Sequence, residues 1–221
     1  KIIDNFKKKK FFSKLHKIDR CKVKKIFKKI KNKYLLSQNN LENISFVLKI
    51  ASNYRIRLEV ILQVLNKFKG LPHRQERLSL NDEITCINDS KATNFESTSQ
   101  SLKSYQNIFW IVGGLPKKGD KFSLNKFKKN IIKAYIIGKS TIFFKKQLRK
   151  KVNFSVVNNL ENAVLKVIKD LKQINNANNL TKNKYTILFS PAAASFDQFT
   201  NFEDRGKKFK ELIYRARSNI Y

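Results

Sequence analysis

From residue 84 onward, short and nearly continuous apolar runs alternate with amphipathic stretches, and this alternation constrains the fold more than any other feature. Strands buried on both faces carry continuous apolar runs, whereas helices place apolar residues three or four positions apart. The pattern predicts strands at 84–88, 108–112, 134–137, 154–157 and 185–189, and helices near 95–104, 124–130, 140–149, 160–172 and 203–217. We therefore expect an α/β fold with a Rossmann-like, mostly parallel sheet and helices on both faces.

The part of the chain before Leu71 has a different, helical pattern. Two apolar stripes are expected, one at Leu41, Ile44, Val47, Leu48 and Ala51, and one at Leu58, Ile61, Leu62, Leu65 and Phe68, with Gly70 as the helix stop. In residues 1–36, lysine runs alternate with apolar pairs, which suggests edge strands and turns. Leu71-Pro72 breaks the helical pattern. We expect a domain boundary there, with domains 1–69 and 70–221.

The charge is strongly positive, because 48 Lys+Arg stand against 16 Asp+Glu, a formal net charge of +32. Such a charge suggests nucleic acid or an anionic membrane as a partner. However, the lysines lie on every predicted helix face, Asn, Ile and Phe are also abundant, and no nucleic-acid recognition motif accompanies them. We favour compositional drift and expect neither a specific nucleic-acid partner nor a membrane. A basic nucleic-acid-binding module stays as an alternative.

Other features favour a cytoplasmic protein. No apolar stretch approaches the roughly 18 residues that span a bilayer, and no signal-peptide pattern occurs at the start. The two cysteines, Cys21 and Cys86, lie far apart and have no His or Cys at metal-ligand spacing, so we expect them to be reduced.

Three loops after predicted strands carry unusual chemistry: Asn88–Asn94, Gly113–Gly119 and Ser190–Phe199. Each has a structural interpretation by itself. Asp89 and its hydroxyl neighbours suit a helix cap, Gly113-Gly114 suits a turn, and the small residues 191–194 let a helix approach the sheet. Ligands of parallel sheets bind at the carboxyl ends of the strands. Together, the lysines, hydroxyls and helix N-termini of these loops favour a ligand with carboxylates or phosphates.

The same segments carry a family resemblance. Gly70-Leu71-Pro72-His73-Arg74, Asn88–Asn94 and Ser190–Phe199, followed by Asn201-Phe202-Glu203 and Arg205-Gly206, resemble the Mur ligase family in order and spacing, from about Leu36 to Phe209. Asn39-Asn40-Leu41-Glu42-Asn43 resembles the end of the family's central domain, with Asn39 in place of a histidine. The resemblance implies that 1–69 is the C-terminal part of a central ATP-binding domain and 70–221 a C-terminal amino-acid-binding domain.

The resemblance also implies a reaction. The family uses ATP and Mg²⁺ to phosphorylate a terminal carboxylate, and an amine then attacks the acyl phosphate to give an amide. The closest resemblance is to the member that adds D-glutamate to UDP-N-acetylmuramoyl-L-alanine in peptidoglycan precursor synthesis. It implies these two molecules and ATP as partners of a monomeric enzyme. Another Mur-type or a folylpolyglutamate-type amide ligase is the alternative.

Carried over residue by residue, the resemblance implies two sets of contacts. ATP contacts are expected at Asn40, Asn43, Arg74 and Asp89, with Arg74 at phosphate and Asp89 at the ribose. D-glutamate contacts are expected at Lys117, Thr93 and Ser195, which also form the catalytic set, and at Phe196, Phe202 and Lys91. Lys117 would pair with a carboxylate, although the Leu-Pro-Lys-Lys loop leaves the choice between Lys117 and Lys118 open. His73 is expected to make a structural hydrogen bond.

Several parts of the family pattern are absent from the sequence. It contains no Gly-x-x-Gly-Lys-[Ser/Thr] phosphate loop, no central-domain magnesium ligands and no methionine. We therefore expect no metal site within these residues. The expectation is a chain that lacks roughly the first half of the enzyme and is inactive alone.

Overall fold

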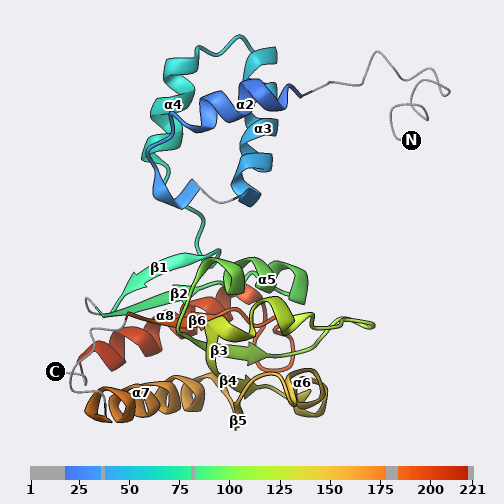
Figure 1. The fold of residues 1–221 in the computed structure, drawn as a ribbon, viewed down its shortest axis with the longest axis vertical. Helices are drawn as coiled ribbons and strands as arrows, with labels where there is room; N and C mark the ends of the chain where they lie inside the picture. The colour runs from blue at the N-terminus through green and yellow to red at the C-terminus, as the bar shows by residue number, and fades with distance from the viewer. Residues whose placement is uncertain (1–17, 36–37, 81–82, 178–183, 219–221) are drawn as a thin grey trace. The chain divides into compact units, whose positions relative to one another are not determined.

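The computed structural model describes residues 18–35, 38–80, 83–177 and 184–218. The chain divides into two compact units, an N-terminal unit, Lys1–Gly70, and a C-terminal unit, Leu71–Tyr221 (Figure 1). The division falls inside the interval where the apolar pattern changes. The assignment of the two units to two ligase domains stays a prediction.

The described part of the N-terminal unit is helical. It contains α2 (Arg20–Phe27), the 3₁₀ helix η2 (Lys33–Leu35), α3 (Gln38–Asn53) and α4 (Leu58–Lys67). Their apolar faces enclose a small core of Val23, Ile30, Leu35, Ile44, Leu48 and Leu65. Asn32 fastens the chain to the end of α4, because its Nδ2 donates to the carbonyls of Leu65 and Phe68 at 2.9 and 2.6 Å.

The prediction of edge strands within residues 18–35 was wrong, and residues 1–17 lie outside the described residues. Asp19 starts a helix instead, because its side chain accepts hydrogen bonds from the backbone of Cys21 and Lys22 at 2.9 and 3.1 Å. Val23 and Ile26 then lie three residues apart, which places both on the face that meets the core.

Two residues of the predicted helical stripes were also assigned wrongly. Val47 is 46% exposed, because it lies on the flank of α3 while its neighbour Leu48 faces the core. Phe68 is 38% exposed, because α4 ends at Lys67 and Phe68 is already its C-cap residue with extended backbone. The helix therefore ends three residues before Gly70, the predicted stop.

The C-terminal unit is built on a sheet of β1 (Glu76–Ser79), β2 (Ile84–Asn88), β3 (Ile108–Gly113), β4 (Ile131–Ile137), β5 (Phe154–Asn158) and β6 (Tyr185–Phe189). The strand order is β1-β2-β6-β3-β4-β5, and only β1 pairs in the antiparallel direction. Strand β6 returns between β2 and β3, so the sheet is doubly wound.

Helices cover both faces of this sheet (Figure 1). Helices α5 (Phe95–Ser104) and α6 (Thr141–Leu148), with the 3₁₀ helix η3 (Leu124–Lys126), pack on one face. Helices α7 (Leu160–Ala177) and α8 (Phe202–Ser218) pack on the other. Alternate residues of β3 serve the two faces, since Phe109 joins the core under α7 and α8 and Trp110 the core under α5 and α6. The predicted α/β fold class is confirmed.

The detailed differences from the predicted elements have local causes. Residues 124–130 form two 3₁₀ helices, η3 and η4 (Lys128–Asn130), because the segment anchors only Leu124 and Phe127 in the core on its way into β4. Strand β4 begins at Ile131, three residues before its predicted start at Ala134. Helix α7 continues to Ala177, beyond its predicted end at residue 172. Strand β1 was missed because, at the edge of the sheet, its polar residues bury little besides Leu78.

A buried ion cluster joins β4 to α7. Asp170 is 8% exposed and accepts hydrogen bonds from Lys133 Nζ at 2.7 Å and Tyr135 Oη at 2.8 Å, with Lys166 Nζ at 3.2 Å. Burial acts to raise the pKa of Asp170, but these three donors outweigh burial and hold the pKa below its ordinary value. The cluster therefore stabilises the fold only while the carboxylate is ionised.

We predict that Asp170→Asn lowers the free energy of unfolding at pH 7 by about 2 kcal/mol. Because the folded-state pKa is depressed, the stabilisation is complete above the unfolded-state pKa and is lost as pH falls through the folded-state value. The difference between the two proteins in urea unfolding should therefore shrink below about pH 4. Lys169→Gln, an exposed neighbour on α7, is the control. A loss that is independent of pH would contradict the assignment.

Candidate functional site

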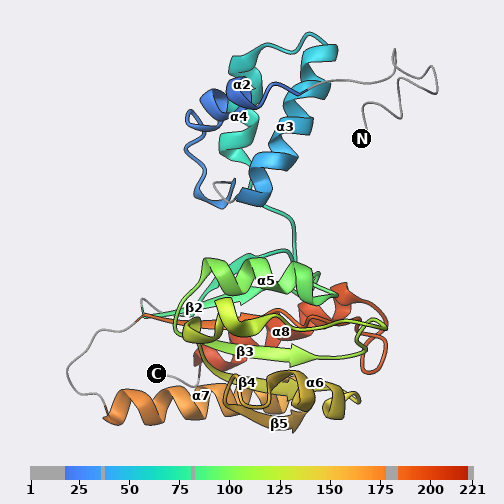
Figure 2. The ribbon, with the colours of Figure 1, turned by 45° about the vertical axis from the view of Figure 1, so that its right-hand side comes forward.

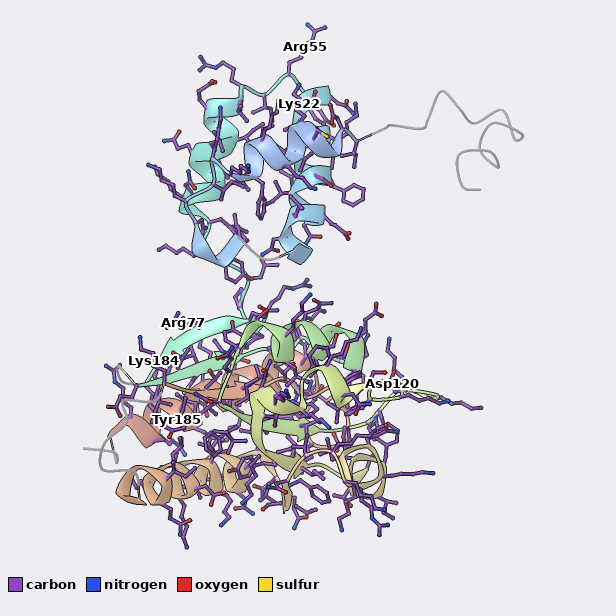
Figure 3. All side chains as sticks on the ribbon, in the orientation of Figure 1. Lys22, Arg55, Arg77, Asp120, Lys184 and Tyr185 are labelled. Carbon is purple, nitrogen blue, oxygen red and sulfur yellow. The ribbon has the colours of Figure 1, made fainter. Side chains whose placement is uncertain are left out.

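The carboxyl ends of β2, β3, β4 and β6 lie at one edge of the sheet, because these strands run parallel. The predicted ligand loops leave the sheet there, and we call this the loop edge. Figure 3 marks both ends, since Tyr185 begins β6 at one end and Asp120 lies in the loop beyond the other. Figure 2 shows the arrow of β3 pointing toward the loop edge.

The loop after β3 is paired with the loop after β6. Leu115 and Ala194 form an antiparallel bridge with two backbone hydrogen bonds of 2.9 Å, and Gly113 N donates to the Pro191 carbonyl at 2.9 Å. Gly114 has a φ of +126°, and a Cβ there would lie 2.3 Å from the Ala194 carbonyl oxygen. The glycine is therefore required for the close approach of the two loops.

Asp89 connects the loop after β2 with α5 and with the loop after β6. Its Oδ2 accepts hydrogen bonds from Ser101 Oγ at 2.6 Å and Ser190 Oγ at 2.9 Å, and its Oδ1 accepts from Gln75 N at 3.2 Å. Burial raises the pKa of Asp89 to about 6, although these hydrogen bonds and the positive charge of Arg74 oppose the rise. The buried Asp89 side chain thus links the loop after β2, helix α5 and the loop after β6.

Ser190 continues this network toward β3. Its carbonyl accepts a hydrogen bond from Trp110 Nε1 at 2.8 Å, and its hydroxyl lies 2.9 Å from Thr98 Oγ1. Trp110, Ser190 and Thr98 are all completely buried. The start of the β6 loop is therefore fixed to both α5 and β3.

A second polar cluster lies where β2 meets α8. Asn88 Nδ2 donates to the Gly206 carbonyl at 3.0 Å and lies 3.0 Å from His73 Nδ1. Glu76 receives Lys210 Nζ at 2.6 Å and the backbone N of His73 at 3.0 Å. Burial lowers the pKa of His73 and favours its neutral form. Such an environment suits a structural hydrogen bond better than proton transfer.

The residues predicted to hold D-glutamate differ in exposure. Lys91 is exposed, and its Nζ lies 3.9 Å from the centroid of the Phe202 ring, so these two are in contact. Thr93 is half-buried, Phe196 is 71% exposed and Ser195 is only 2% exposed. The Ser195 side chain is thus buried, while Phe196 is open to solvent.

Lys117 lies in the β3 loop and is exposed, as is Lys118. No hydrogen bond or ion pair connects Lys117 with Thr93 or Ser195 among the described side chains. Asp120 lies in the same loop, and its Oδ2 is buried without a hydrogen-bond partner. Most buried carboxylate oxygens in proteins are hydrogen-bonded, so Asp120 is an exception among the described side chains of this edge.

The predicted ATP contacts lie in both units. Arg74 is exposed and lies close enough to Asp89 for its charge to lower the pKa of that carboxyl. Asp89 itself is 4% exposed, and both of its oxygens already accept hydrogen bonds from the protein. In the N-terminal unit, Asn43 is exposed, and Asn40 Nδ2 donates to the Tyr34 carbonyl at 3.0 Å.

The sequence did not predict that Arg205 links two of the loops. This residue is 1% exposed and donates to the carbonyls of Ser90 and Ala193, one on each of two ligand loops. An arginine followed by a glycine near the start of a helix was the available signal. A Cβ at Gly206 would lie 2.2 Å from His73 Nδ1, so the glycine lets α8 approach the loop edge.

Fold and site together define a Rossmann-like α/β domain whose ligand loops meet at the carboxyl ends of parallel strands. Within the described ranges, no group of three or more His, Cys, Asp or Glu side chains gathers as a metal site. No helix in those ranges is long and apolar enough to cross a membrane.

The chain is similar to proteins named UDP-N-acetylmuramoylalanine–D-glutamate ligase. The one from Wolbachia sp. subsp. Brugia malayi is 38% identical over 182 residues, which are 82% of this chain and 35% of that protein. The one from Rickettsia felis is 37% identical over 184 residues, 83% of this chain and 40% of that protein. The one from Brucella abortus is 38% identical over 180 residues, which are 81% of this chain and 37% of that protein. No protein-family model matches.

These relatives confirm the resemblance to Mur ligases inferred from the motifs, and their names are those of ligases. The matched segments form the C-terminal portion of the relatives. The chain spans about 35–40% of the length of the curated relatives it matches. The contacts assigned to Lys117, Thr93, Ser195 and the other site residues stay predictions.

We predict that the stability contributed by Asp89 depends on pH in the opposite sense to that of Asp170. Because the folded-state pKa is raised, the contribution is complete below the unfolded-state pKa and is lost as pH rises through the folded-state value near 6. Relative to Asp89→Asn, the wild type should lose roughly 2.4 kcal/mol of unfolding free energy between pH 4 and pH 7.

The measurement is urea unfolding of both proteins across this pH range. Asp204→Asn, which changes a half-buried carboxylate on α8, controls for the change in net charge. A constant difference between wild type and Asp89→Asn would show that Asp89 ionises in the folded protein as it does in the unfolded chain.

Proposed function

We propose that this chain is the amino-acid-binding part, with the end of the ATP-binding domain, of a cytoplasmic ligase that joins D-glutamate to UDP-N-acetylmuramoyl-L-alanine in peptidoglycan precursor synthesis. The observation that carries the proposal is the 37–38% identity to proteins of that name over about four-fifths of the chain. The loop edge supports it, because its exposed lysines and buried donors suit an anionic substrate.

In the proposed reaction, the terminal carboxylate of UDP-N-acetylmuramoyl-L-alanine takes the γ-phosphoryl group of ATP, and the D-glutamate amine attacks the resulting acyl phosphate. Phosphate leaves the tetrahedral intermediate, and an amide bond forms. When bound, ATP supplies the phosphoryl group and Mg²⁺ neutralises its charge. This chain would contribute mainly orientation of the amine, which converts a bimolecular encounter into a positioned attack.

The residues of the C-terminal unit have distinct proposed roles. Lys117 pairs with a carboxylate of D-glutamate, and the hydroxyls of Thr93 and Ser195 hydrogen-bond to it. Phe196 and Phe202 form the apolar walls, and Lys91 adds positive charge. Its contact with the Phe202 ring supports the placement of both at one pocket.

The nucleotide contacts proposed from the family resemblance are Asn40, Asn43, Arg74 and Asp89. The guanidinium of Arg74 suits a phosphate, because it presents paired N–H donors to an anion. Asn40 and Asn43 are proposed to lie beside the adenine. Asp89 is proposed to meet the ribose. Its oxygens have interior partners, so a ribose hydroxyl would have to share an acceptor with Gln75, Ser101 or Ser190.

We predict that the complete reading frame that contains this chain releases phosphate from ATP when given UDP-N-acetylmuramoyl-L-alanine and D-glutamate. Lys117→Ala should reduce kcat/KM for D-glutamate by about 100-fold, because it removes the charge partner of a carboxylate. Lys118→Ala, the exposed neighbour, should change it by less than about threefold. The assay is coupled phosphate release with several amino acids in turn.

Other results of the phosphate-release assay would change the proposed function or the proposed pocket lysine. Release with another amino acid would make the protein a different Mur-type or a folylpolyglutamate-type ligase. Loss in Lys118→Ala instead of Lys117→Ala would reassign the pocket lysine. No release, together with nucleic-acid binding that persists above physiological salt, would favour the basic nucleic-acid module, since incidental charge gives binding that salt abolishes.

We also predict that the 221-residue chain alone forms no amide and releases no phosphate. Its sequence contains no phosphate loop to hold the β- and γ-phosphates of ATP. The measurement is mass-spectrometric detection of the D-glutamyl product after prolonged incubation. Product formed by the chain alone would contradict the prediction.

A further inference from the structure

Arg205 is the most completely buried charged side chain of the described residues, with 1% of its surface exposed. Its Nε donates to Ser90 Oγ at 3.1 Å, and its Nη2 donates to the Ser90 carbonyl at 2.8 Å. Nη1 and Nη2 both donate to the Ala193 carbonyl at 3.1 Å. A planar guanidinium therefore links the loop after β2 to the loop after β6.

The guanidinium has no carboxylate in contact among the described residues. All four hydrogen bonds end on neutral acceptors, two backbone carbonyls and one hydroxyl. Removing a charge from water costs several kcal/mol unless strong partners replace the water. Burial lowers the pKa of Arg205 to about 10, although the negative charge of Asp197 opposes the fall, so the side chain stays protonated at neutral pH. A buried positive charge, offset only in part by Asp197, is thus held between the two loops.

The two loops carry the residues proposed to bind D-glutamate. Lys91 and Thr93 follow Ser90 by one and three residues, and Ser195 and Phe196 follow Ala193 by two and three. Ser90 Oγ also donates to the Phe202 carbonyl at 2.8 Å, which adds the start of α8 to the same assembly. Hydrogen bonds to Arg205 therefore fix the spacing of both sides of the pocket.

We propose that Arg205 is a positioning residue for the amino-acid pocket, which sets the separation of the 88–94 and 190–199 loops and adds a buried positive charge on the side of an anionic amino acid. This inference rests on the proposed function. It goes beyond it by assigning substrate affinity to a side chain that does not touch the substrate.

A structural role alone would destabilise the protein without a selective effect on the amino acid. The Asp170 cluster is the matched control, because it is also a buried polar network on α7 and β4. It contacts Lys133 near the start of β4, away from the loop edge. Asp170→Asn should lower the unfolding temperature but leave KM for D-glutamate within about twofold of the wild type.

The test measures KM and kcat for D-glutamate in the complete reading frame. Arg205→Met should raise KM for D-glutamate by about tenfold or more, and Arg205→Lys should recover part of the loss because it keeps the charge. Ser90→Ala removes one acceptor of Arg205 and should raise KM by about threefold. Ser90→Ala therefore tests the positioning role of Arg205 even if the arginine variants do not fold.

A second readout uses the 221-residue chain, which contains one tryptophan. Trp110 donates to the Ser190 carbonyl at the base of the β6 loop. Release of that loop in Arg205→Lys should shift the Trp110 emission to longer wavelength, and Asp170→Asn should leave it unchanged. A shift in both variants would indicate general loosening and would overturn the inference.

The two proposals fail in different ways. If the wild type releases no phosphate with D-glutamate, the proposed function fails. If the wild type is active and Arg205→Met, Ser90→Ala and Asp170→Asn all leave KM unchanged, the positioning role of Arg205 fails while the proposed function stands.

Discussion

The loop edge depends on the buried carboxylate of Asp89. It lies directly after β2, yet it binds Ser190 at the end of β6 and Ser101 on α5, so one side chain joins segments about 100 residues apart in the sequence. A carboxylate is buried at acceptable cost only when donors surround it. Its two hydroxyl donors and the backbone N of Gln75 meet this condition, and the adjoining contacts of Trp110 and Thr98 extend the same network.

The parallel strands impose a further requirement on the loop edge. Their carboxyl ends leave backbone groups that no further ladder satisfies, and the loops must find other partners. Arg205 and Asn88 supply them, since both side chains donate to loop or helix carbonyls. The polar residues at this edge therefore contribute to the folded structure together with the apolar core. A site built on such a frame has little freedom to move its loops apart.

The sequence predicted the main features of the fold because strong periodic signals mark them. Continuous apolar strands such as Ile108–Gly113 and the stripes of α7 and α8 are dictated by burial. The prediction failed where burial is slight, at the edge strand β1 and in the two 3₁₀ helices near Phe127. In the site, short motifs pointed to the three loops. Neither the pairing of Leu115 with Ala194 nor the bridging by Arg205 was evident, because long-range hydrogen bonds leave no local pattern.

The net charge bears on specificity as well as on attraction. Lysines lie on most surfaces, so an anion is drawn toward the whole molecule and gains little preference for one place. Two carboxylates near the loop edge are meanwhile bound to internal partners, Asp89 to hydroxyls and Glu76 to Lys210. Charge alone therefore cannot select one amino acid. In the proposed function, selection would come from fixed distances between loops, and the hydrogen bonds of Arg205 to uncharged acceptors link two of these loops.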